Sequence, residues 1–270
     1  MEFFVIIVFV LGLIIGSFLN VVILRYNSGR SITGRSSCSS CGRELCWYDL
    51  IPLASFIAQR GRCRICGSRI SCQYPIVELI TGIVFAGVFV KVFTSYDFVS
   101  VFSAFIFFAV IWSLLVVISV YDIKHKIIPD GIVYAFDFLA LVTIFVNGVT
   151  VPAIVAGPLL ALPFALLWLI SKGTWMGLGD AKLIIGIGWL LGLRGGFSAV
   201  VWGIWIGAVL SIAFMLIQRI SLVKNIHLFS KTERFTMKSE LPLGPFLIIG
   251  LVLVFFFNAD VISFIQSIAG

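Results

Sequence analysis

The feature that most constrains this chain is a succession of apolar runs, several of which are long enough to cross a membrane as helices. A helix rises about 1.5 Å per residue, so about 20 apolar residues span the hydrocarbon core of a bilayer. The chain has 270 residues, of which 61% are hydrophobic and only 11% are charged. Soluble domains carry about 25% charged residues. The sequence therefore predicts an all-α polytopic membrane protein with about eight transmembrane helices.

The first apolar run, Phe3 to Leu24, has Glu2 before it and Arg25 after it. A cleaved signal peptide has the opposite layout, with basic residues before a shorter apolar core. We therefore expect residues 1–24 to be a retained first helix whose C-terminal end faces the cytosol. Its small residues between Gly16 and Asn20 favour close helix packing. Hydropathy predicts the other helices at 75–92, 99–121, 131–146, 151–171, 181–193, 197–218 and 243–257.

Residues 25–74 differ from the rest because they are polar and basic and contain all six cysteines. CSSCG at 38–42 and CRICG at 63–67 form an internal repeat. Two such turns present four thiolates, which complete a closed tetrahedral site for a structural Zn²⁺. Disulfides or unligated thiols are the alternatives, although disulfides are rare in the cytosol. Cys46 and Cys72 are left over as buried thiols or alternative ligands. The predicted metal ligands are Cys38, Cys41, Cys63 and Cys66.

The basic residues identify the cytosolic side of the membrane. If residues 25–74 are cytosolic, alternation places the loops 122–130, 172–180 and 219–242 on the same side. Lys182 lies just inside the sixth helix at this face, and only Lys91 and Arg194 fall on the opposite side. Eight crossings then put both termini outside. The net charge of +7 is thus distributed as in a membrane protein. We expect the basic loops to contact lipid headgroups, and we expect no nucleic-acid partner.

Asp122 and Asp180 each lie where an apolar run meets a short polar loop. Two predicted helices separate them, so the chain returns to the face it left and both aspartates are at the cytosolic face. The second ends the sequence Gly177-Leu178-Gly179-Asp180. The helix that follows is only about 20 Å long, so this sequence is expected to lie below the membrane surface. Gly177 and Gly179 permit a close approach by another backbone, such as a peptide substrate.

A pair of carboxylates at one face indicates acid and base chemistry. Two nearby carboxylates cannot both ionise cheaply, so they tend to share one proton. The ionised member can take a proton from an attacking water, while the protonated member supports the carbonyl oxygen of a peptide bond. This proteolysis requires no metal. The structural alternatives are that Asp180 caps its helix and that Asp122 pairs with Lys124 or Lys126.

The ordered set of motifs closely resembles the bacterial type IV prepilin peptidases, a branch of the GxGD intramembrane aspartyl proteases. The resemblance covers nearly the whole length. Its motifs are GSFLNVV at 16–22, the paired CxxCG turns, WYDLIP at 47–52, RGRC at 60–63, YPIVEL at 74–79, DIKHKIIPD at 122–130, GLGDAKL at 177–183 and LGPF at 243–246.

That resemblance implies removal of the basic leader of type IV prepilins or pseudopilins, after a glycine at the cytosolic face of the bacterial inner membrane. It assigns proteolysis to Asp122 and Asp180. It also implies a methyltransferase-associated zinc domain at 25–74, a seven-helix peptidase domain at 75–270, and N-methylation of the new N-terminus by S-adenosylmethionine. No residues are assigned to the methyl donor, and Glu78 is a candidate for handling substrate or donor. Asp130 is expected to be structural, and Asp137 has no partner that the sequence identifies.

Three other interpretations remain open at this point. A membrane transporter could relay protons through the aspartates, with the cysteine segment as a regulatory zinc sensor. A noncatalytic assembly factor could recruit a cytosolic partner through the same segment. A GxGD protease could also act without methylation. The oligomeric state cannot be derived from the sequence.

Overall fold

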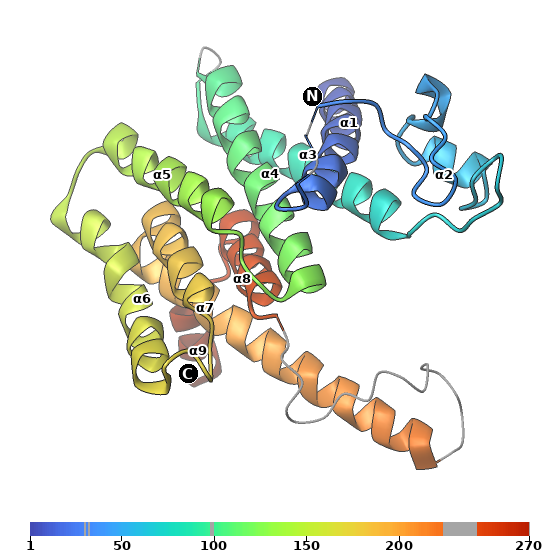
Figure 1. The fold of residues 1–270 in the computed structure, drawn as a ribbon. Coiled ribbons are helices and arrows are strands. Elements are labelled where there is room, and N and C mark those ends of the chain that lie inside the picture. Colours follow the sequence, from blue (N-terminus) through green and yellow to red (C-terminus); the bar gives the residue numbers. More distant parts are fainter. Residues whose placement is uncertain (30, 32, 98–99, 224–241, 270) are drawn as a thin grey trace. The chain divides into compact units, whose positions relative to one another are not determined.

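The computed structural model describes the whole chain except residues 30, 32, 98–99, 224–241 and 270. The chain divides into two compact units, Met1–Val120 and Tyr121–Gly270. Both units are built from helices, with only two isolated β-bridges among the described residues (Figure 1). The predicted domain boundaries at residues 25 and 75 follow changes in composition and hydropathy along the sequence, and they stay predictions.

The first unit is based on a close pair of helices, α1 and α3. A Cβ added to Gly12 would lie 2.8 Å from the Cα of Gly82, and one added to Gly16 would lie 2.7 Å from the Cα of Glu78. Asn20 is wholly buried in the same helix. Small residues let the two backbones approach this closely, which confirms the packing role predicted for residues 16–20. The main helices of this unit are α1 (Glu2–Arg25), α3 (Gln73–Ser95) and most of α4 (Val101–His125).

Aromatic rings join α4 to α3. The ring of Phe105 meets the rings of Phe85 and Phe89 edge to face, at centroid distances of 6.0 and 5.8 Å. This arrangement suits the quadrupoles of aromatic rings and adds to the burial of apolar area. Between α1 and α3 the chain forms two cysteine turns, a 3-10 helix η1 (Trp47–Asp49) and a short helix α2 (Ala54–Ala58).

The second unit is arranged around one long element, α7, which packs against α5, α6 and α8. Burial follows these contacts, because Phe136, Leu183, Ile184 and Leu247 have no exposed surface. The helices of this unit are α5 (Asp130–Asn147), α6 (Val151–Ser171), α7 (Leu178–Val223), α8 (Gly244–Phe257) and α9 (Val261–Ala269). The last of these, α9, was not predicted from the sequence.

The element α7 contains both the sixth and the seventh predicted helices, which meet at Gly192. Gly192 has φ 70° and ψ 179°, a conformation that is essentially restricted to glycine. The chain reverses there, because a Cβ on Gly196 would lie 3.1 Å from the Cα of Gly188. Those two residues would be about 12 Å apart in a straight helix. Two helices are therefore confirmed, but the break falls at Gly192, inside the predicted sixth helix and before the predicted gap at 194–196.

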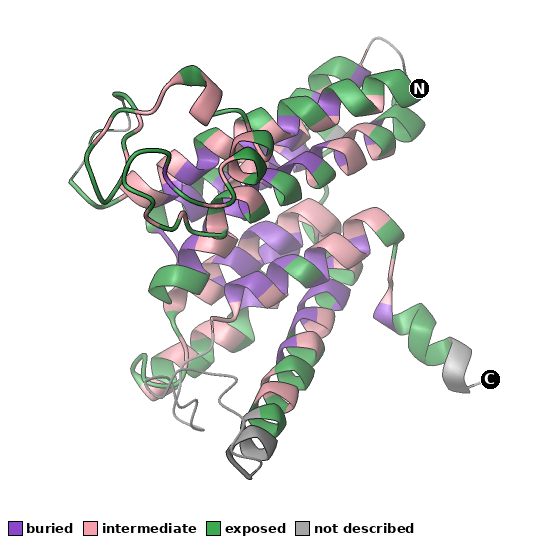
Figure 2. Ribbon diagram, turned by 90° about the vertical axis from the view of Figure 1, so that its right-hand side faces the viewer, coloured by how far each residue is buried: buried purple, intermediate pink, exposed green. Residues whose placement is uncertain are grey.

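The exposed surface supports the prediction of a membrane protein. In the described part of the chain, five helices are long and apolar enough to cross a membrane, namely α1, α3, α4, α6 and α7, and α8 is a shorter apolar helix. Figure 2 shows that many helical residues are exposed, and along α6 they include Leu162, Leu166 and Ile170. Such a surface would aggregate in water but suits lipid. The count of eight crossings stays a prediction, and most of the basic loop 219–242 lies outside the described residues.

Candidate active site and metal centre

Asp122 lies in the last turn of α4 and is 4% exposed. Its Oδ2 accepts a hydrogen bond of 3.1 Å from the backbone N–H of Gly244, the first residue of α8. The start of a helix offers unpaired N–H groups and a partial positive charge, so it holds a carboxylate well. A Cβ at residue 244 would lie 2.7 Å from the same oxygen. Glycine therefore allows this contact.

Asp180 lies in the first turn of α7 and is partly exposed. It is close enough to Asp122 for the two charges to interact. Ile128 packs against Gly179, which precedes Asp180, and against Gly244, which is hydrogen-bonded to Asp122. A Cβ on Gly179 would lie 2.8 Å from the Cβ of Ile128, and a Cβ on Gly244 would lie 3.4 Å from its Cδ1. The structure thus brings the two predicted aspartates to one place in the second unit.

The pairing of Asp122 with a lysine receives no support from the contacts, whereas the capping role considered for Asp180 stays open, since Asp180 lies in the first turn of α7. Among the described residues, the ion pairs of the second unit involve Asp130 and Asp260. Asp122 forms none with Lys124 or Lys126, all three of which are described.

The two predicted substrate glycines differ in their surroundings. Gly177 is exposed, and a Cβ there would meet nothing closer than 3.9 Å. Gly179 is covered by Ile128, which occupies the space that a side chain on Gly179 would need. Contact of either glycine with a substrate stays a prediction.

A polar stripe on α5 faces α7 beside the aspartates. The Nζ of Lys182 lies 2.7 Å from Oδ1 of Asp130 and 4.9 Å from the ring centre of Tyr134. This ion pair supports a structural role for Asp130. One turn deeper, Asp137 is buried against Gly186, and its Oδ1 has no hydrogen-bond partner among the described residues.

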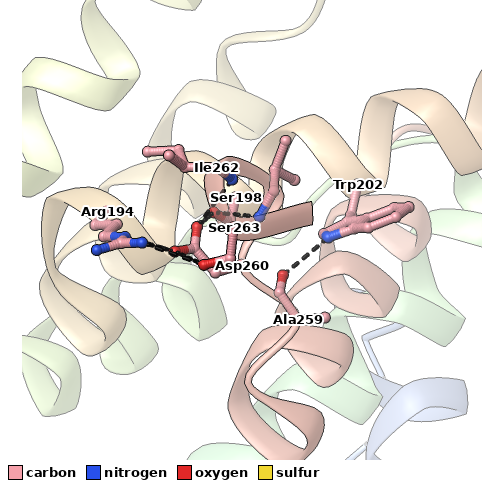
Figure 3. Close-up of polar contacts among 8 residues, drawn as sticks. Arg194, Ser198, Trp202, Ala259, Asp260, Ile262 and Ser263 are labelled. Atoms are coloured by element: carbon pink, nitrogen blue, oxygen red, sulfur yellow. Dashed lines mark hydrogen bonds and ion pairs between the residues drawn. The ribbon is translucent and has the colours of Figure 1, made fainter. Parts of the chain in front are cut away.

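A second polar cluster, which sequence reasoning missed, lies at the turn between α8 and α9 (Figure 3). Asp260 binds the guanidinium of Arg194, accepts a 2.8 Å hydrogen bond from Ser198 and also accepts one from Ser263. Burial raises the pKa of Asp260, but the hydrogen bonds, led by Ser198 and Arg194, outweigh it and lower the pKa to about 2. Trp202 donates to the carbonyl of Ala259 in the same turn. The cluster fastens α9 to the second half of α7.

The two cysteine turns of the first unit repeat one backbone pattern. In the first, the N–H of Gly42 donates to the carbonyl of Cys38 at 2.9 Å. In the second, the N–H of Gly67 donates to the carbonyl of Cys63 at 3.0 Å. Both glycines have positive φ, 72° and 68°, and each turn is closed by one antiparallel bridge. The internal repeat predicted from sequence is thus also a structural repeat.

The four predicted ligands gather around one point. The Sγ atoms of Cys38, Cys41, Cys63 and Cys66 all lie within 4.8 Å of one another. The Cys38 and Cys66 sulfurs are 3.9 Å apart, far beyond the length of about 2.05 Å of a disulfide bond. Tetrahedral Zn–S bonds of about 2.3 Å would separate the sulfurs by about 3.8 Å. The set therefore fits a metal ion rather than disulfides.

Electrostatics favours the thiolate at two of the four cysteines, Cys38 and Cys66. Hydrogen bonds from the backbone N–H groups of Cys41 and Ser40 lower the pKa of the Cys38 thiol to about 6. Hydrogen bonds to Ser68 likewise lower the pKa of Cys66. At Cys41 the N–H of Arg43 lowers the pKa, but the Cys38 thiol, burial and the Cys66 thiol outweigh it and raise the pKa to about 11. The remaining two cysteines lie outside the cluster, and neither is a buried thiol, because Cys46 is half-buried and Cys72 is exposed.

Asp49 links the two turns, which sequence reasoning also missed. Its side chain is only 3% exposed and lies 3.5 Å from Arg43 of the first turn and 3.2 Å from Arg64 of the second. Gln59 donates a further hydrogen bond of 3.1 Å. The available signal was Arg43 directly after the first CxxCG motif and Arg64 inside the second, but their charge alone indicated only the cytosolic side.

Comparisons with known proteins agree with this arrangement. Residues 10–92 match the bacterial peptidase A24 N-terminal domain, and residues 109–212 match the type IV leader peptidase family. The chain is 33% identical to the prepilin leader peptidase/N-methyltransferase of Bacillus subtilis, over 97% of this chain and 98% of that protein. It is 30% identical to the protein of the same name from Vibrio cholerae, over 95% and 98%.

A relative from Myxococcus xanthus, also a prepilin leader peptidase/N-methyltransferase, is 34% identical over 79% of this chain but only 64% of its own length. No solved structure matches the chain significantly. The first matched region contains the cysteine turns, and the second contains both aspartates. The chain therefore belongs to the type IV leader peptidase family.

Proposed function

We propose that this protein cleaves the basic leader from type IV prepilins or pseudopilins and methylates the N-terminus that cleavage exposes. The observation that carries the proposal is the convergence of Asp122 and Asp180 in a membrane protein of this family. Both activities appear in the names of the relatives. The transporter interpretation is not favoured, because the relatives are peptidases.

In this mechanism Asp122 and Asp180 share one proton. The ionised carboxylate takes a proton from water as the water attacks the scissile carbonyl, and the protonated carboxyl donates a hydrogen bond to the carbonyl oxygen. The proton then passes to the leaving amine. Gly244 holds Asp122 through its N–H, which fixes one oxygen and leaves the other for the substrate. The open space at Gly177 gives the substrate backbone room beside Asp180.

Zinc is the metal that we assign to the cysteine cluster. Four thiolates leave no open coordination position, so the ion would be structural rather than catalytic. It would hold the two turns together in a segment too small to form a large core of its own.

We further propose that the protein lies in the bacterial inner membrane with both termini outside. The loops that carry most of the Lys and Arg residues are then cytosolic, as the positive-inside rule requires. The cysteine cluster and the paired aspartates face the cytosol in this topology. A basic leader is also cytosolic, so cleavage at this face needs no transfer of the leader across the membrane.

Co-expression with a prepilin, followed by mass spectrometry of the product N-terminus, tests the two activities together. The expected product lacks the leader and carries one added methyl group. Recovery of the intact prepilin alone would contradict the proposal, and recovery of an unmethylated product would restrict it to proteolysis.

A further inference from the structure

An apolar pocket in the first unit is not used by the proteolytic mechanism. It has a volume of about 390 Å³, within the range of about 300–1,000 Å³ of ligand pockets. One side is α1 and the other is the segment that follows the first cysteine turn. Trp47 at its rim is 77% exposed, although a large aromatic side chain gains most from being covered. The lining residues are Val10, Leu13, Ile14, Ser17, Trp47, Leu50, Ile51 and Pro52.

A buried carboxylate adjoins this pocket. Glu78 of α3 is 6% exposed and lies beside Ser17, which lines the pocket, although Glu78 itself is not among the lining residues. Its Oε2 also accepts a 2.9 Å hydrogen bond from the backbone N–H of Leu53, the residue after the pocket-lining Pro52. No cation in the described part of the chain forms an ion pair with Glu78. A buried charge without a countercharge is costly and usually functional.

The backbone at this place is strained. Leu53 has φ 58° and ψ −49°, a conformation that a leucine rarely adopts. Strained residues persist where the surrounding structure holds them, and they cluster at ligand sites. Here the hydrogen bond to Glu78 holds the N–H of Leu53. Strain, burial and the pocket thus occur together around one carboxylate.

We propose that this pocket binds the apolar N-terminal residue of the cleaved pilin, with its α-ammonium group paired to Glu78. The inference rests on the proposed function and deepens it, because it assigns a place for the methyl acceptor. Apolar walls suit the side chain, and the carboxylate suits the ammonium. The membrane-spanning helix α1 forms one wall, so the following apolar residues could remain in lipid. A lipid chain lacks the cation, and a lining that is apolar apart from Ser17 suits an apolar side chain better than the polar methyl donor.

The test measures peptide binding in the absence of methyl donor. The purified full-length protein in nanodiscs is titrated with a fluorescent apolar peptide that begins with Phe, in free-amine and N-acetylated forms. Acetylation removes the charge and keeps the apolar side chain. We expect the free amine to bind about tenfold or more tightly than the acetylated form. Equal binding would overturn the proposal.

Two variants separate the pocket from general folding. Glu78→Gln can still accept the hydrogen bond from Leu53, so it should fold and bring the ratio of the two affinities to about one. Ile14→Trp fills the pocket from an exposed position of α1 and should weaken both peptides, whereas Leu11→Trp, exposed but outside the lining, should bind as wild type. The site would be rejected if Glu78→Gln still bound the free-amine peptide more tightly than the acetylated one, or if Ile14→Trp bound both peptides as wild type does.

Leader removal measured on the same variants keeps the two claims distinguishable. Leu11→Trp should cleave and methylate the prepilin as wild type does, whereas Glu78→Gln and Ile14→Trp should leave any cleaved product unmethylated. If the wild-type protein cleaves no prepilin, the proposed function fails. If it cleaves and the two peptides bind equally, only the acceptor pocket fails.

Discussion

At the scale of single residues, the contact between Asp122 and Gly244 decides whether the site can work. Any side chain at residue 244 would displace a carboxylate oxygen or the adjacent Ile128. The active site therefore depends on a residue that carries no chemistry of its own. The motif LGPF was part of the family resemblance, but nothing in its residues indicated that it would meet an aspartate 122 positions earlier.

Gly244→Ala should slow leader removal, by up to about a hundredfold, because a misplacement of about 1 Å is enough for such a loss. Gly207→Ala is the matched control, since its Cβ would meet only the movable ring of Phe246 at 3.1 Å. The measurement is the cleavage rate of a prepilin by each purified variant. Wild-type rates for Gly244→Ala would show that the hydrogen bond does not position Asp122.

The Asp260 cluster makes a prediction about pH. The folded-state pKa of about 2 lies below the value of about 3.9 expected in an unfolded chain. The ionised form therefore stabilises the fold above about pH 4, and this contribution is lost as the pH falls toward 2. The melting temperature of Asp260→Asn in detergent should be below that of wild type at pH 7, and the difference should shrink in acid. A difference independent of pH would contradict the assignment.

At the scale of elements, the sequence of the cysteine segment predicted its metal ligands correctly but did not indicate its buried carboxylate, Asp49. The repeat predicted the four ligands because CxxCG turns are local and their spacing limits what they can bind. The buried Asp49 could not be predicted, because its partners Arg43 and Arg64 come from different turns and meet only in the fold. The pattern of charges along a sequence indicates which segments are exposed, but it does not identify which charged residues form buried ion pairs.

The double variant Cys38→Ser/Cys63→Ser should lose its bound zinc, because it removes one ligand from each turn. Cys46→Ser/Cys72→Ser should retain it, since those sulfurs lie outside the cluster. Elemental analysis of the purified proteins measures the metal directly. Equal zinc in the two double variants would reject the site.

For the helices as well, features set by neighbouring residues were predicted, whereas features set by the whole fold were not. Hydropathy predicted most of the helices and a gap between residues 193 and 197. The reversal itself depends on one residue with φ 70°, which no apolar pattern reveals. The helix α9 was missed because its nine residues are far shorter than a membrane span.

At the scale of the whole molecule, hydropathy predicted the fold class, and counting crossings predicted that the two aspartates lie at one face of the membrane. The structure places both aspartates near Ile128, whereas the number of crossings stays a prediction. The packing of Ile128 between Gly179 and Gly244, beside the aspartates, could not be derived from the sequence because these residues meet only in the fold. The orientation in the membrane stays a prediction of the basic loops.

Thiol labelling of intact cells with an impermeant reagent tests that orientation. Thr150→Cys, in the loop after α5, should be labelled from outside, whereas His125→Cys, beside the aspartates, should not. The wild-type protein is a control with its own prediction, because its six cysteines all lie in the segment expected in the cytosol. Labelling of His125→Cys or of the wild type would reverse the topology.

Cleavage of a prepilin by purified Asp122→Asn and Asp180→Asn tests the central claim most directly. Each variant removes one charge and keeps the shape of the side chain, and Asp130→Asn serves as the control from the start of the next helix, α5. The account predicts that both variants bind the prepilin but leave its leader attached, while Asp130→Asn cleaves within a few-fold of wild type. Normal leader removal by either Asp122→Asn or Asp180→Asn would contradict it.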